Sequence, residues 1–156
     1  RGDRGYGTVS DMPSVRAWEE IPHRVIYGDT DAMGVVYYAN YLRFVEMARN
    51  EFLRRRGATY RDMESDGYML PVSDVRMKYL APARYDDELI VGIRVQTLKR
   101  VSITFDYEIR RLEDSRVLAQ GETTHACVDR ATGKVCRFPE RVRELIERAP
   151  NLTEDV

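Results

Sequence analysis

Apolar and polar residues alternate with a period of two through most of the second half of the chain. The alternation is cleanest over residues 101–110, and it also runs through residues 74–81, 89–96 and 116–129. In the first of these segments one face carries only apolar side chains, which are Val101, Ile103, Phe105, Tyr107 and Ile109. Successive side chains of a β-strand point to opposite faces, so the pattern predicts four strands of a half-buried antiparallel sheet.

The first half of the chain begins with one more strand and then changes to helical spacing. Residues 19–27 alternate like the later strands. Beyond them a broad apolar stripe recurs at three- and four-residue intervals: Tyr38, Tyr41, Leu42, Val45, Ala48, Phe52 and Leu53. We expect a helix of roughly 18 residues here, nearly engulfed by its surroundings and ending just before Gly57. Shorter helices are predicted over residues 59–67 and 139–148.

This order of elements favours an α+β domain in which a curved antiparallel β-sheet wraps around one long central helix. We place a single domain at residues 19–149. Residues 1–18 form a polar, glycine-rich N-terminal tail that we expect to be mobile, and residues 150–156 form a C-terminal tail. The open edge of such a sheet invites pairing with a second copy of the chain.

Composition narrows the class of protein. The 156 residues are 43% hydrophobic and carry a formal net charge of −1 without a dominant basic tract, so we expect one packed domain that does not bind nucleic acid. No apolar run approaches the roughly 18 residues that span a bilayer, and no signal-peptide pattern is visible, so we expect a cytoplasmic protein. Cys127 and Cys136 flank a turn, and we expect two free thiols, with a disulfide across the turn as the less favoured alternative.

Two aspartates stand just before the long helix, in the stretch GDTDAMG. Asp29 is interpreted as a turn or cap residue, because an aspartate there can accept backbone N–H bonds. Asp31 lies closer to the free N–H groups of the helix start, which could stabilise a developing negative oxygen on a substrate carbonyl. A carboxylate beside that carbonyl could attack it or deprotonate a water, and Gly34 would let a ligand approach the backbone. We therefore predict acyl transfer chemistry, with a cleft beside Asp31.

Other chemistries fit the sequence less well. A calcium loop counted from Asp29 would place Met33 and Asn40 at positions that need oxygen ligands from acidic side chains. The histidines and cysteines lack zinc spacings, so no metal is expected. A G-x-S-x-G serine motif is absent, and His125 is interpreted as a strand residue with a satisfied ring.

The segment YGDTDAMGVVYYANY, residues 27–41, resembles the signature of the hotdog-fold acyl-CoA thioesterases of the 4-hydroxybenzoyl-CoA thioesterase and YbgC type. The order of elements over about residues 20–135 also matches. The resemblance implies hydrolysis of an acyl-CoA or acyl-carrier-protein thioester, with Asp31 as nucleophile or general base. It also implies that the backbone N–H of Tyr38 polarises the thioester carbonyl and that Tyr27 assists. Many YbgC-like members carry histidine where this chain has Tyr38.

The same resemblance extends to binding and assembly. It implies substrate contacts from Gly34, Val35 and Asn40, and contacts of Lys99, Arg100 and Ser102 with the phosphates of coenzyme A, which is part of the substrate rather than a separate cofactor. It further implies a homodimer or homotetramer whose active sites are built from two protomers. Two alternatives stay open: a non-catalytic acyl-thioester binding module, and an enoyl hydratase. The hydratase is disfavoured because no histidine lies between His23 and His125.

Overall fold

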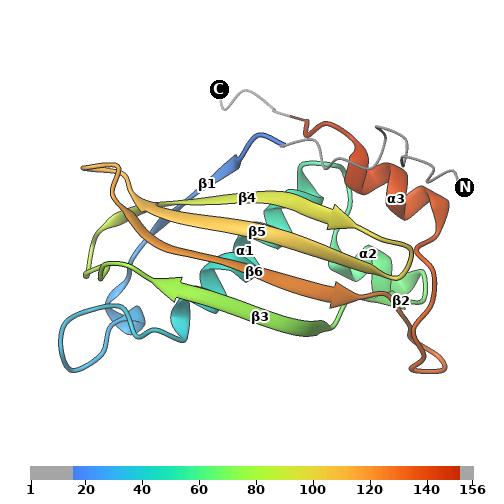
Figure 1. The fold of residues 1–156 in the computed structure, drawn as a ribbon, viewed down its shortest axis with the longest axis horizontal. Helices are drawn as coiled ribbons and strands as arrows, with labels where there is room; N and C mark the ends of the chain where they lie inside the picture. The colour runs from blue at the N-terminus through green and yellow to red at the C-terminus, as the bar shows by residue number, and fades with distance from the viewer. Residues whose placement is uncertain (1–15, 152–156) are drawn as a thin grey trace, which may run out of the picture.

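A five-stranded antiparallel sheet with one long helix across it forms the body of the protein (Figure 1). The computed structural model describes residues 16–151; the predicted tail residues 1–15 and 152–156 lie outside this range. The strand order is β1-β4-β5-β6-β3. The strands are β1 (Glu19–Arg24), β3 (Val72–Tyr79), β4 (Glu88–Leu98), β5 (Ser102–Arg111) and β6 (Val117–Ala126).

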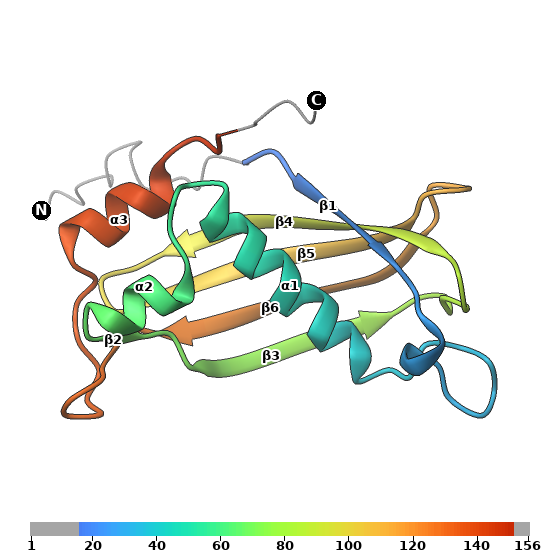
Figure 2. The same cartoon turned by 180° about the vertical axis from the view of Figure 1, so that it is seen from behind.

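The helices lie on one side of this sheet or at its end (Figure 2). The long helix α1 (Asn40–Arg54) crosses the sheet diagonally. The smaller elements are η2 (Tyr27–Asp29), α2 (Tyr60–Ser65), β2 (Tyr68–Met69), β7 (Val128–Asp129) and α3 (Glu140–Glu147). The β2–β7 pair was not predicted, and β1 ends three residues before Tyr27, which lies in η2 rather than in a strand.

The predicted alternation of the central strands is confirmed. Every second residue from 89 to 95 in β4 and from 103 to 109 in β5 is buried in the core that also holds the buried face of α1: Leu89, Val91, Ile93, Val95, Ile103, Phe105, Tyr107 and Ile109. Phe52 of α1 meets Phe105 edge to face, with ring centroids 5.4 Å apart. The opposite face of the sheet is polar, and Gln96 there donates hydrogen bonds to both Asp106 and Glu122. Burial of one apolar face therefore fixes the strand register.

The buried face of α1 differs from the predicted stripe. Phe44 and Arg49 are buried, whereas Tyr38 and Leu42 are exposed and the helix begins at Asn40. Near-complete engulfment is wrong for a single protomer, because the sheet covers only one side of the helix and Leu42 and Met47 face outward. The predicted left-handed residue at the helix end is confirmed by Gly57, with φ +84°.

Three further predictions concern the end of the N-terminal tail, the two cysteines and membrane-spanning helices. Trp18 packs against Arg94, whose guanidinium carbon is 4.0 Å from the ring centroid, so the packed part of the chain begins before residue 19. Cys127 and Cys136 are free thiols with their Sγ atoms 3.6 Å apart, as expected. Among residues 16–151, no helix is both long enough and apolar enough to cross a membrane.

Candidate active site

The loop between β1 and α1 is tied together by the buried Asp29. Its Oδ2 accepts the backbone N–H of Ile26 at 3.0 Å, and its carbonyl oxygen accepts the backbone N–H of Tyr37 and the side-chain amide of Asn40. The side chain of His23 lies 3.4 Å from the same carboxylate. The interpretation of Asp29 as a turn residue is confirmed, and it anchors both ends of the loop. The contact of Asn40 with substrate stays a prediction, since one of its amide donors holds this loop.

Asp31 opens a tight turn on this loop. Its backbone N–H donates to Val35, its carbonyl accepts from Gly34, and its Oδ1 accepts the backbone N–H of Met33 at 2.8 Å. Gly34 has φ +76° and open space where a side chain would lie, so the turn itself favours glycine there. The side chain of Asp31 is half-buried, and within residues 16–151 its Oδ2 has no hydrogen-bond partner. One carboxylate oxygen is therefore fixed while the other stays free.

The turn is held against the rest of the fold by its C-terminal side. Val35 pairs with Arg84, and the backbone N–H of Val36 donates to Ala83 at 2.8 Å. The segment just before β4 thus holds the Asp31 loop in place through backbone contacts with Val35 and Val36. The side chain of Val35 is half-buried.

Tyr38 lies in the turn that leads into α1. The next backbone N–H groups already donate three residues back, from Asn40 to Tyr37 and from Tyr41 to Tyr38. The N–H groups of Tyr38 and Ala39 donate to no acceptor within the described part of the chain. They are unsatisfied donors at the positive end of a helix, which is the type of group that stabilises an oxyanion.

Tyr79 of β3 fixes this turn from the sheet. Its hydroxyl donates to the carbonyl oxygen of Tyr38 at 2.9 Å. Burial raises the pKa of Tyr79, and burial also raises that of Tyr41, so both hydroxyls are protonated at neutral pH. Sequence reasoning missed Tyr79 because it reads as an ordinary strand residue, and no local signal links it to a turn 41 positions earlier.

Large apolar side chains around the loop face solvent in a single protomer. Each of the following is at least 58% exposed: Ile26, Tyr27, Met33, Tyr38 and Tyr85. Tyr27 contacts Tyr85 edge to face, with ring centroids 5.8 Å apart. Exposed apolar patches of this kind mark surfaces that a partner or a ligand covers.

The other predicted binding residues lie far from Asp31 in one protomer. Lys99 and Arg100 form the exposed turn between β4 and β5, and Ser102 begins β5. That turn and the Asp31 loop stand at opposite ends of the sheet (Figure 1). Neither Asp31 nor Tyr38 lines three of the cavities that residues 16–151 form, which measure about 760, 570 and 250 Å³. The predicted cleft beside Asp31 is thus not found among these cavities of one protomer.

The family model described as the thioesterase-like superfamily matches residues 25–146. The chain belongs to this superfamily. A curated relative, the acyl-CoA thioesterase YbgC of Haemophilus influenzae, is 37% identical over 123 residues, which are 78% of this chain and 89% of the relative. The resemblance drawn from residues 27–41 is confirmed.

Solved structures give the same family. The 1,4-dihydroxy-2-naphthoyl-CoA thioesterase from Synechocystis has a TM-score of 0.78 and 26% identity, covering 83% of this chain and 96% of that one. A gentisyl-coenzyme A thioesterase has a TM-score of 0.73 and 26% identity, covering 80% of this chain and 99% of that one. The predicted hotdog fold and the predicted enzyme class, thioester hydrolase, are confirmed.

Proposed function

We propose that this chain hydrolyses the thioester of an acyl-CoA, with Asp31 as the catalytic carboxylate. The observation that carries the proposal is that one carboxylate oxygen of Asp31 and the backbone N–H groups of Tyr38 and Ala39 have no hydrogen-bond partner within residues 16–151. All three residues lie in the segment that Asp29 ties together. The relatives named for acyl-CoA substrates support the choice of thioester. Coenzyme A arrives as part of the substrate, and no separate cofactor is proposed.

In the proposed reaction the thioester carbonyl oxygen accepts the N–H of Tyr38. The Oδ2 of Asp31 then either attacks the carbonyl carbon, expelling the thiolate and leaving a mixed anhydride that water opens, or takes a proton from the water that attacks. Both routes break the same C–S bond and deliver a carboxylate, and of the two protons of the attacking water one goes to the thiolate and the other to solvent. Both need an ionised Asp31, so one variant tests them together.

Asp31→Asn should lower kcat by about a hundredfold or more, because an amide is neither a base nor a nucleophile. The asparagine oxygen can still accept the N–H of Met33, so the turn and the melting temperature should be kept. Glu144→Gln removes one negative charge from an exposed position on α3 and is the matched control. The measurement is thiol release from a panel of acyl-CoA and acyl-carrier-protein thioesters. Turnover within a few-fold of wild type for Asp31→Asn would overturn the assignment.

The same panel tests the alternatives to hydrolysis. A non-catalytic binding module would bind these thioesters but release no thiol from any of them. An enoyl hydratase would change an unsaturated acyl group while its thioester stays intact. Either result would replace the hydrolase proposal.

We further propose that two protomers pair through β3 and share the active sites. β3 is an edge strand whose Val72, Val75 and Tyr79 are each more than 40% exposed. A two-fold axis normal to the sheet would pair β3 antiparallel with its copy. It would bring the Asp31 end of one protomer to the same end of the joint sheet as the partner's β4–β5 turn. Lys99, Arg100 and Ser102 would then meet the phosphates of a coenzyme A bound at the other protomer's Asp31.

A homodimer of this kind would build the cleft beside Asp31 from two protomers. The exposed Tyr27 and Tyr38 would become covered on pairing, and Tyr27 would then stand beside the acyl group. We place the protein in the cytoplasm, where thiols such as Cys127 and Cys136 stay reduced.

A further inference from the structure

The turn between β4 and β5 is held by the part of the chain that follows β6. The backbone N–H of Cys127 donates to the carbonyl oxygen of Val101 at 2.7 Å, and the backbone N–H of Phe138 donates to the carbonyl oxygen of Arg100 at 3.0 Å. Both donor residues are buried, so these two N–H groups belong to the packed body of the protein. Two neighbouring carbonyl oxygens of the turn are therefore fixed from the core.

A side chain of α3 binds a third carbonyl oxygen of the same turn. The Nη1 atom of Arg143 donates to the carbonyl oxygen of Lys99 at 2.8 Å, although the two residues are 44 positions apart in the sequence. Figure 1 shows α3 at the same end of the sheet as this turn. Arg143 is half-buried and belongs to no ion pair within residues 16–151. Its positive charge therefore adds to the charges of Lys99 and Arg100.

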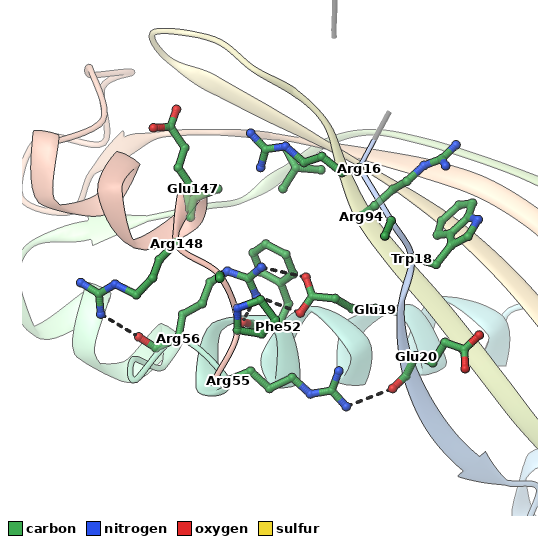
Figure 3. Close-up of a pocket in the computed structure, with 15 residues that line it drawn as sticks. Arg16, Trp18, Glu19, Glu20, Phe52, Arg55, Arg56, Arg94, Glu147 and Arg148 are labelled. Atoms are coloured by element: carbon green, nitrogen blue, oxygen red, sulfur yellow. Dashed lines mark hydrogen bonds and ion pairs between the residues drawn. The ribbon is translucent and has the colours of Figure 1, made fainter. Parts of the chain in front are cut away.

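The helix α3 is itself fixed, so it can hold the turn in place. Its residues Val142 and Ile146 are buried in the core. Just after the helix, Arg148 donates to the carbonyl oxygen of Arg56, which lies just beyond α1, at 3.3 Å (Figure 3). The segment of α3 thus connects the end of α1 to the β4–β5 turn, and Arg143 is the side chain that reaches the turn.

The turn keeps donors free for a ligand. The N–H of Lys99 donates to the carbonyl oxygen of Ser102 at 2.8 Å and closes the turn. The N–H groups of Arg100 and Val101 donate to no acceptor within residues 16–151, and the side chains of Lys99 and Arg100 are exposed. Unpaired backbone N–H groups beside two cationic side chains are groups that bind phosphate oxygens.

We propose that Arg143 is a positioning residue for coenzyme A. It holds the turn in the conformation in which Lys99 and Arg100 meet the phosphates, and its charge strengthens their attraction. The proposal rests on the proposed function, from which it takes the phosphate contacts of this turn. A turn that is ordered before the ligand arrives loses less conformational entropy on binding, so Arg143 contributes to affinity without touching the reacting atoms.

Arg143→Met keeps the length of the side chain but removes its charge and its donors. Titration calorimetry with coenzyme A should give a Kd about tenfold higher than that of the wild type, since a hydrogen bond from a charged group is lost. The Kd for pantetheine, which lacks the phosphates, should be unchanged. Arg143→Lys keeps the charge and a donor, so it should recover most of the affinity. In hydrolysis of an acyl-CoA, KM should rise in Arg143→Met while kcat stays within about twofold of wild type.

Arg141→Met is the matched control. Arg141 lies on the same helix and carries the same charge, but it pairs with Asp66 at 2.8 Å. Its Kd for coenzyme A should stay at the wild-type value. Trypsin reports on the turn directly, because this protease cuts after Lys99 and Arg100. Cleavage at these two sites, followed by mass spectrometry, should be about fivefold faster in Arg143→Met and unchanged in Arg141→Met.

Neither calorimetry nor proteolysis needs turnover, so both can be made in the Asp31→Asn background. If no thiol were released from any thioester while both changes occurred, the hydrolase proposal would fail and the role of Arg143 would stand. An unchanged Kd for coenzyme A in Arg143→Met would overturn that role. An equal loss of affinity in Arg141→Met would also overturn it, because it would show a general effect of charge.

Two more results would count against positioning. Weaker binding of coenzyme A to Arg143→Met without faster cleavage of the turn would reduce Arg143 to a charge and overturn its positioning role. Absence of coenzyme A binding to the wild type would overturn the proposal together with the phosphate contacts on which it rests.

Discussion

A chain of buried hydrogen bonds around His125 makes the stability of this protein depend on pH in a predictable way. Arg49 donates to the hydroxyl oxygen of Tyr107 at 3.1 Å, and the Tyr107 oxygen lies 2.7 Å from the Oγ1 of Thr123. That Oγ1 lies 2.8 Å from His125 Nε2, and His125 Nδ1 lies 3.0 Å from the carbonyl oxygen of Leu70.

The two ends of this hydrogen-bonded series limit the directions in which its protons can point. Arg49 can only donate, and the Leu70 carbonyl can only accept. The consistent arrangement is donation from Tyr107 to Thr123, from Thr123 to His125 Nε2, and from His125 Nδ1 to Leu70. A proton added at Nε2 would reverse the hydroxyl of Thr123 and leave the hydroxyl proton of Tyr107 without an acceptor in this series, so the arrangement favours the neutral imidazole.

The magnitude follows from the pKa of His125. Burial lowers this pKa from 6.5 to about 4, and the nearby charge of Arg49 acts in the same direction, while the bond to Leu70 opposes them. In the unfolded chain the ring takes up its proton near pH 6.5, whereas the folded protein does so only near pH 4. Stability is therefore complete above pH 6.5 and falls as the pH drops towards 4. At about 1.4 kcal/mol per pH unit the loss is about 3 kcal/mol.

The assay is urea unfolding at fixed protein concentration, followed by circular dichroism at a series of pH values between 7 and 4. His125→Gln cannot titrate, so it should be less stable at neutral pH but should lose about 3 kcal/mol less than wild type over this interval. His125→Asn should give the same difference. Parallel curves for wild type and both variants would refute the neutral, buried histidine.

Two further predictions test the fold and the assembly. Gly121→Ala should lower the free energy of unfolding by about 1–3 kcal/mol, because its Cβ would collide with the carbonyl oxygen of Arg76 and lie 2.8 Å from Met77 Sδ. Gly28→Ala is the control, because there is open space around Gly28. Equal melting temperatures for the two variants would contradict the packing argument. Val75→Lys should shift sedimentation from dimer to monomer and reduce thiol release, because like charges would face each other across the paired β3 edges. Lys78→Glu at the same edge adds no positive charge, so it is the control and should sediment like the wild type. An unchanged dimer with Val75→Lys would rule out pairing through β3.

The agreement between pattern and structure is best where interactions are local. Period-two alternation placed β4 and β5 correctly because each side chain's face follows from the backbone geometry of its own strand. Thr59 caps α2 by accepting the N–H of Asp62, and Gly57 ends the long helix, both within a few residues. The loop motif of residues 27–41 likewise carried the family assignment, since its turn and helix start are formed by neighbours in sequence.

Contacts between residues distant in sequence decided the features that the pattern did not predict. Arg49 reads as a solvent-facing residue of α1, yet it is buried because Tyr107, 58 positions later, supplies a hydroxyl acceptor. Tyr79 fixes the turn at Tyr38, although it lies 41 positions later in the sequence. Sequence alone thus determined the main strands and helices and the motif of the Asp31 loop, because those depend on local periodicity and spacing. The tertiary structure decided which polar groups are buried and where clefts form, because those depend on which surfaces the fold brings together.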